Sequence, residues 1–154
     1  MGQSLIVALP RKWQLSSIAS LLGSLENASP DAIKLFDEQL EISISNDAWV
    51  VIEVLPDRDL VNGIDHKEEF ESDPDLDTRF RRDLDLLHFF AARYNDLDLM
   101  RGILRRVAQE ILSRDEIAWI DTDNGWAISV RDFLEKTDQD PTWDWRVWAP
   151  DNKA

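Results

Sequence analysis

Cysteine is absent from the sequence of 154 residues. Its absence excludes disulfides, thiolate nucleophiles and cysteine metal sites, and it fits a reducing compartment. Glycine is also scarce. The five glycines are too widely separated to form a glycine-rich phosphate loop, and no Gly-x-Ser-x-Gly nucleophile elbow occurs. These absences remove several common catalytic designs.

Long hydrophobic runs are also missing. No apolar segment approaches the roughly 20 residues that cross a membrane as a helix. The run Leu5–Leu9 is shorter than the apolar region of a signal peptide, and it lacks a basic segment before it. We therefore expect a cytoplasmic protein that does not enter a membrane.

Charge is the strongest global signal. Seventeen basic residues oppose thirty-one acidic ones, which gives a formal net charge of −14. Such a surface repels nucleic acids and anionic membranes and attracts basic proteins. Many acidic proteins use their charge only for solubility, so solubility and partner selection both remain open.

Apolar periodicity predicts the order of elements. Expected strands are Ser4–Leu9, Leu40–Ser45, Trp49–Leu55, Ile117–Asp121 and Trp126–Val130; expected helices cover residues 14–26, 29–40 and 80–94, a segment from Asp96 to Ile111, and a last turn at Val130–Lys136. The fold class is then α+β, with a mostly antiparallel sheet of about five strands and helices packed on one face. Residues 1–140 form a single domain, with an exposed acidic loop at about 56–79.

Two of the expected helices depend on local signals. Ser29-Pro30-Asp31 is typical of a helix start, and Ile33, Phe36 and Leu40 follow at helical spacing. From Phe80 onwards, apolar side chains again recur with a helical period, at Leu84, Leu87, Ala91 and Tyr94. Asp96 could cap a further helix.

The stretch Ala118–Trp126 contains two aspartates, an asparagine and a glycine between apolar runs. A calcium loop of the EF-hand type would place Asp121 and Asp123 at its first and third positions. Gly125 then falls one position too early, and Asp132 replaces the glutamate that such a loop needs. A hairpin turn explains the same residues more simply.

The two histidines do not indicate a catalytic site. His66 lies in the acidic loop beside Asp65, Glu68 and Glu69, which could hold a metal only if the fold made them converge. A solvated loop histidine is the simpler interpretation, and His88 is expected to be packed inside a helix. No catalytic residue, metal site or cofactor is predicted.

Three of the seven tryptophans gather near the end of the chain. Trp143, Trp145 and Trp148 lie between Pro141 and Pro150, in a tryptophan-rich strap at residues 141–154. A strap that buries its rings against the domain is one interpretation, and a partner surface is the other, because tryptophan is enriched at interface hot spots. Trp49, Trp119 and Trp126 are expected in the core.

Together these features favour a protein-binding module with a basic partner. Bacterial immunity proteins, which neutralise a cognate toxin such as a nuclease, share this general character, although no motif connects this sequence to them. The candidate partner-binding residues are Asp57, Asp59, Glu68, Glu69, Glu71, Asp73, Asp75, Asp77, Trp143 and Trp145. The alternative is a small enzyme or metal-dependent ligand-binding protein that uses carboxylates and His66.

Overall fold

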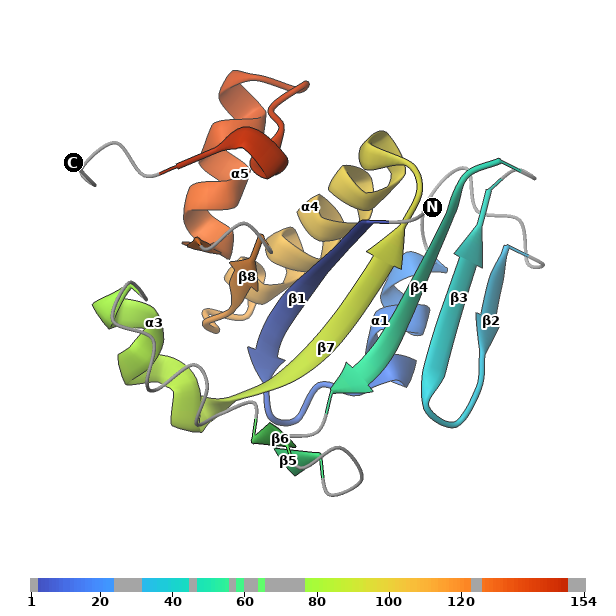
Figure 1. Ribbon diagram of the computed structural model, residues 1–154, viewed down its shortest axis with the longest axis horizontal. Helices are drawn as coiled ribbons and strands as arrows, with labels where there is room; N and C mark the ends of the chain where they lie inside the picture. The colour runs from blue at the N-terminus through green and yellow to red at the C-terminus, as the bar shows by residue number, and fades with distance from the viewer. Residues whose placement is uncertain are drawn as a thin grey trace.

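A computed structural model describes residues 3–23, 32–44, 47–55, 58–59, 64–65, 77–122 and 126–149 (Figure 1). Its strands are β1 (Gln3–Pro10), β2 (Ile33–Leu35), β3 (Gln39–Ser43), β4 (Trp49–Leu55), β5 (Arg58–Asp59), β6 (Ile64–Asp65), β7 (Leu87–Tyr94), β8 (Trp119–Asp121) and β9 (Ala127–Ser129). Its helices are α1 (Leu15–Leu22), α3 (Thr78–Asp83), α4 (Leu97–Ser113) and α5 (Val130–Gln139), with short 3₁₀ turns η1 (Leu84–Leu86) and η2 (Trp145–Val147).

The described strands form one main antiparallel sheet in the order β2-β3-β4-β7-β1-β8-β9. The prediction of about five strands was therefore wrong, since this sheet has seven. The two additional strands, β2 and β7, come from segments whose apolar spacing predicted helices. Strands β5 and β6 pair with each other in a separate small sheet beyond the end of β4 (Figure 1).

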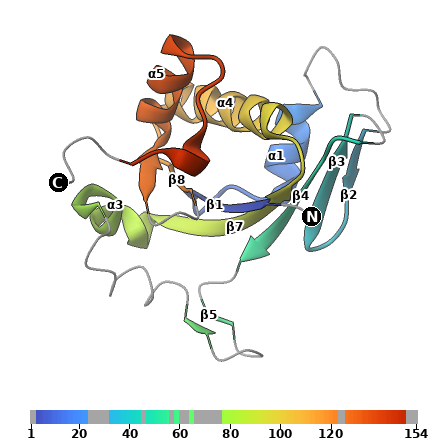
Figure 2. The same ribbon diagram turned by 45° about the horizontal axis from the view of Figure 1, so that its top comes forward.

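The main hydrophobic core lies between the sheet and helices α1, α4 and α5, which cover one of its faces (Figure 2). Alternate residues of the central strands point into it, among them Leu5 and Val7 of β1 and Phe90 and Ala92 of β7. Trp145 of η2 also belongs to this core. Because successive strand residues face opposite sides, the intervening side chains form the other face of the sheet.

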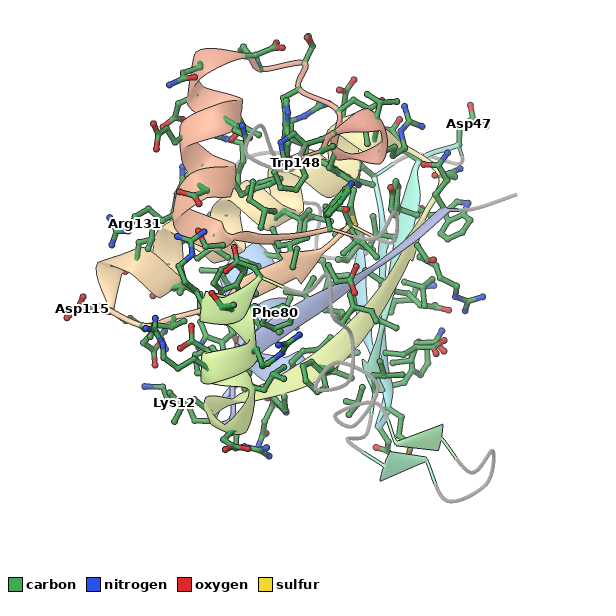
Figure 3. The ribbon with its side chains drawn as sticks, turned by 60° about the vertical axis from the view of Figure 1, so that its left-hand side comes forward. Lys12, Asp47, Phe80, Asp115, Arg131 and Trp148 are labelled. Atoms are coloured by element: carbon green, nitrogen blue, oxygen red, sulfur yellow. The ribbon has the colours of Figure 1, made fainter. Side chains whose placement is uncertain are left out.

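A smaller core on that second face corrects the prediction that the helices pack on one face of the sheet only. Phe80 of α3 points to the sheet, where its ring stacks on Trp119 with centroids 5.3 Å apart (Figure 3). Ala8, Leu84, Leu87 and Phe89 complete this cluster. The helices are thus not confined to one face, because α3 packs against the opposite side from α1 and α4.

Residues 33–40 form a hairpin and not the expected helix. In the pairing of β2 with β3, Ile33 lies opposite Ile42 and Leu35 lies opposite Leu40. The helical spacing of Ile33, Phe36 and Leu40 was therefore accidental, and the period-two pattern of the paired strands decides the structure. The predicted helix start at residues 29–31 lies outside the described residues.

The segment predicted as a helix at 80–94 is helical only as far as η1 and then becomes β7. This strand is central in the sheet, between β4 and β1. Phe90, Ala92 and Tyr94 enter the main core, while Leu87 and Phe89 enter the second one. A strand that is buried on both faces has a nearly continuous apolar sequence, so its alternation is hidden.

Several other predictions are confirmed. α4 occupies the expected position, and α1 begins where expected but ends earlier, at Leu22. The Asp96 side chain caps α4 by accepting a hydrogen bond of 2.9 Å from the Leu99 amide. β8 and β9 pair as the expected hairpin, although its turn residues 123–125 lie outside the described part of the chain. Trp119 is buried as expected, whereas Trp49 and Trp126 are only half-buried.

Candidate protein-binding surface

Most of the acidic side chains predicted to bind a partner lie outside the described residues: Asp57, Glu68, Glu69, Glu71, Asp73 and Asp75. Asp59 is placed by its backbone in β5, where it pairs with Ile64 of β6. The acidic segment begins directly after Leu55, the last residue of β4.

Asp77 is the one predicted acid whose side chain can be described, and this side chain stabilises a helix of the domain. It caps α3, accepting a hydrogen bond of 2.8 Å from the Arg79 amide, and it pairs with the Arg79 guanidinium at 3.1 Å. Burial alone would raise the pKa of Asp77, but these hydrogen bonds and the positive charge of Arg79 outweigh it and lower the pKa. The negative charge of Asp77 is therefore already paired with Arg79.

Of the two predicted tryptophans, Trp145 is fully buried and Trp143 is half-buried. The Trp145 indole donates a hydrogen bond of 3.1 Å to the Tyr94 hydroxyl. The Trp143 ring lies against Phe133, with centroids 5.7 Å apart, and the Lys136 ammonium lies over it. Trp145 thus presents no ring surface to a partner, and the Trp143 ring packs against the main core.

A groove that the sequence did not predict lies at one end of the sheet. It has a volume of about 570 Å³ and opens between the start of α1, the β2–β3 turn, the end of β4 and the start of β7. Its lining residues are Gln14, Leu15, Ser16, Leu35, Phe36, Asp37, Val54, His88 and Phe90. Apolar clefts of this size with a few polar groups are typical of binding sites.

Three apolar side chains of the groove are unusually exposed. Leu35, Phe36 and Val54 have exposed fractions of 48%, 53% and 43%. They are close together, because all three line the same groove. Isolated exposed apolar residues are normal on protein surfaces, whereas large contiguous apolar patches are typical of interaction sites.

Carboxylates flank these apolar side chains. Asp37 and Glu38 form the β2–β3 turn, and both are exposed. Among the described residues, neither belongs to an ion pair within 4 Å. In contrast, nine basic side chains are paired with acids of this chain: Lys12, Arg79, Arg82, Arg93, Arg101, Arg105, Arg106, Arg114 and Arg146. The turn beside the groove therefore carries two negative charges, and no described basic side chain lies within 4 Å of either.

The opposite wall of the groove is made by the first residues of α1. The amide of Gln14 donates a hydrogen bond of 3.1 Å to the Ser17 hydroxyl, which fixes the start of this helix.

His88 lies beside Phe90 on β7, with ring centroids 4.6 Å apart. His66 lies outside the described residues, and within the described ranges no three metal-ligating side chains cluster.

Comparisons with protein-family models, with curated proteins and with solved structures gave no match to this chain. In the described part of the chain, no helix is both long and apolar enough to cross a membrane. Any function must therefore be inferred from the residues themselves.

The exposed groove residues were missed for identifiable reasons. Leu35 and Phe36 were assigned to a helix whose apolar stripe would face the core. Val54 belongs to the expected strand Trp49–Leu55, whose sequence is nearly all apolar and so does not single out an exposed position. The local signal was the sequence Leu35-Phe36-Asp37-Glu38, two large apolar residues followed by two acids. Only the hairpin turn makes that combination a surface feature.

Proposed function

We propose that this protein is an acidic binding module that neutralises a basic protein, as a bacterial immunity protein neutralises a cognate toxin such as a nuclease. This proposal rests on a difference in pairing between basic and acidic side chains. Among the described residues, nine basic side chains pair with acids of this chain, while Asp37 and Glu38 face solvent beside exposed apolar residues. An anionic, partly apolar surface suits a cationic protein surface.

Two physical effects would act in sequence. The net charge of −14 attracts a basic protein over distances of about a Debye length, roughly 8 Å at physiological salt, and so raises the association rate. After encounter, burial of Leu35, Phe36 and Val54 would hold the complex, because affinity comes mainly from desolvated contacts near the centre of an interface.

The test begins with the protein encoded by the neighbouring reading frame, because inhibitor and target genes would have to be expressed together. Co-purification of that protein, and loss of its activity when this chain is added, are expected. Stopped-flow association should slow by at least about tenfold between ~20 mM and ~500 mM salt. An association rate that does not change with salt, or a neighbour that retains full activity in a complex, would contradict the proposal.

The catalytic alternative has its own test. A carboxylate-and-histidine enzyme, or a metal-dependent ligand-binding protein, would require His66 and nearby acids to converge. Metal analysis of the purified protein should find no stoichiometric ion if the binding module is correct. A bound metal that is lost in the His66→Ala variant would favour the alternative instead.

A further inference from the structure

We infer that the groove between α1, the β2–β3 turn and the ends of β4 and β7 seats one apolar side chain of the basic partner. A lysine or arginine next to that side chain would pair with Asp37 and Glu38. This inference rests on the proposed function, and it specifies the recognition site and the chemistry of the segment recognised.

The inner surface of the groove suits an apolar side chain. Leu15 and Phe90 are buried and contribute to its lining, while Leu35, Phe36 and Val54 are partly open to solvent. An inserted side chain would shield these three residues from water, which stabilises a complex by roughly 25 cal/mol for each Å² of apolar surface buried. The volume of about 570 Å³ leaves room for a large aliphatic or aromatic group.

Electrostatics fix the orientation of the partner segment. One wall is the start of α1, at Leu15 and Ser16, where the helix dipole places partial positive charge. The other wall is the turn that carries Asp37 and Glu38. A cation is therefore disfavoured near α1 and favoured near the turn, so the apolar side chain enters the groove while the basic group remains at the acidic side.

The acidic side of the groove is held in place before binding. The Phe36 amide donates a hydrogen bond of 2.8 Å to the Gln39 carbonyl, which closes the turn. The Val54 amide donates one of 3.4 Å to the Glu38 carbonyl, which ties the turn to β4. A preorganised turn loses less conformational entropy when a partner binds.

Short peptides allow this inference to be tested without knowledge of the partner. The probes are three acetylated, amidated tripeptides: Lys-Leu-Lys, Lys-Ser-Lys and Glu-Leu-Glu. Each is titrated into ¹⁵N-labelled protein while amide chemical shifts are followed. Lys-Leu-Lys should shift the amides of residues 35–38, Val54 and His88, with a dissociation constant on the order of 1 mM and at least about tenfold tighter binding than the other two peptides.

Equal binding of Lys-Ser-Lys would overturn the inference, because charge alone would then explain recognition. Equal binding of Glu-Leu-Glu would overturn it as well, because the carboxylates would have no role. Shifts centred on residues outside the groove would show that the peptide binds elsewhere, which also contradicts it.

Variants give the second test. The double variant Leu35→Ser/Phe36→Ser should bind Lys-Leu-Lys at least about fivefold more weakly, and so should Asp37→Asn/Glu38→Gln. Leu86→Ser is the matched control, since Leu86 is 60% exposed and does not line the groove. It should bind within about twofold of the unaltered protein. Equal binding by all the variants would contradict the inference.

The same variants separate this inference from the proposed function. If the unaltered protein binds no basic protein, the proposed function fails, whatever the peptides do. If it binds a basic protein and the two groove variants bind that protein equally well, only the inference about the groove fails.

Discussion

Leu35 and Leu40 lie directly opposite each other across the β2–β3 hairpin, yet Leu35 is 48% exposed and Leu40 is fully buried. The difference follows from the position of each strand in the sheet. β3 has a neighbour on both sides, whereas β2 is an edge strand. Leu40 packs into the main core, and Leu35 reaches the groove. One hairpin therefore supplies both core and surface.

This pair gives a direct prediction about stability. Leu40→Ala should lower the free energy of unfolding by about 2–5 kcal/mol, because it leaves a cavity in the main core. Leu35→Ala should lower it by less than about 1 kcal/mol, since that side chain is already half in water. Urea denaturation followed by tryptophan fluorescence measures both. Similar losses for the two variants would show that the groove is closed in solution.

The hairpin also illustrates what the sequence could predict. Elements whose periodicity is locally clear, such as β1, α1 and α4, were found. Residues 33–40 and 87–94 were not, because the first matched a helical spacing by chance and the second is apolar on both strand faces. In both cases the pairing with distant strands decides the structure, and that pairing is invisible in a local window.

The candidate site was less predictable than the fold. Acidic composition and exposed aromatic residues were reasonable guides, but Trp145 is buried and Asp77 caps a helix. The groove joins α1, β2, β4 and β7, which are far apart in the sequence. The sequence does not show that its exposed residues are neighbours, because this depends on the order of the strands in the sheet.

Asp83 and Trp119 form a hydrogen bond between two buried side chains. The Trp119 indole donates to the Asp83 carboxylate at 3.0 Å, and Asp83 is only 7% exposed. Asp83→Ala should cost about 1–3 kcal/mol of unfolding free energy, because the buried indole loses its acceptor. Asp83→Asn should cost less, since its amide oxygen can still accept. Urea denaturation measures both losses.

The exposed carboxylate Glu135 of α5 provides the control for this pair. Glu135→Ala should change the unfolding free energy by no more than about 0.5 kcal/mol. If Asp83→Ala behaved like this control, the bond to Trp119 would contribute nothing to stability. If Asp83→Asn cost as much as Asp83→Ala, the carboxylate charge would matter more than the acceptor.

Glu116 connects the β1–α1 loop to the segment after α4. Its carboxylate lies 2.5 Å from the Lys12 ammonium and accepts a hydrogen bond of 3.3 Å from the Trp13 indole. Burial alone would raise the pKa of Glu116, but these hydrogen bonds and the charges of Lys12 and Arg114 outweigh it, so the pKa lies below its ordinary value. Glu116 therefore stabilises the folded state when ionised.

The sign of the resulting pH dependence is fixed. A carboxyl whose pKa is lower in the folded than in the unfolded state contributes full stability above the unfolded value, about 4.3. That contribution disappears as the pH falls through the folded pKa. Glu116→Gln should therefore be less stable than the unaltered protein at pH 7, and the difference should shrink below about pH 4.3. Urea unfolding at pH 7 and pH 3 measures it, and a constant difference would contradict this assignment.

Arg101 of α4 anchors the tryptophan-rich strap, and removing it gives the last prediction. Its guanidinium donates hydrogen bonds of 3.1 and 2.9 Å to the Trp143 carbonyl and lies over the Trp145 ring. Arg101→Leu should cost about 2–4 kcal/mol and speed amide exchange at residues 143–149, because the strap loses its only described side-chain bonds from α4. Arg106→Leu, on the same helix, removes only a partly exposed ion pair with Glu110 and should cost no more than about 0.5 kcal/mol. Equal losses, or unchanged exchange in the strap, would mean that Trp145 is held by apolar packing alone.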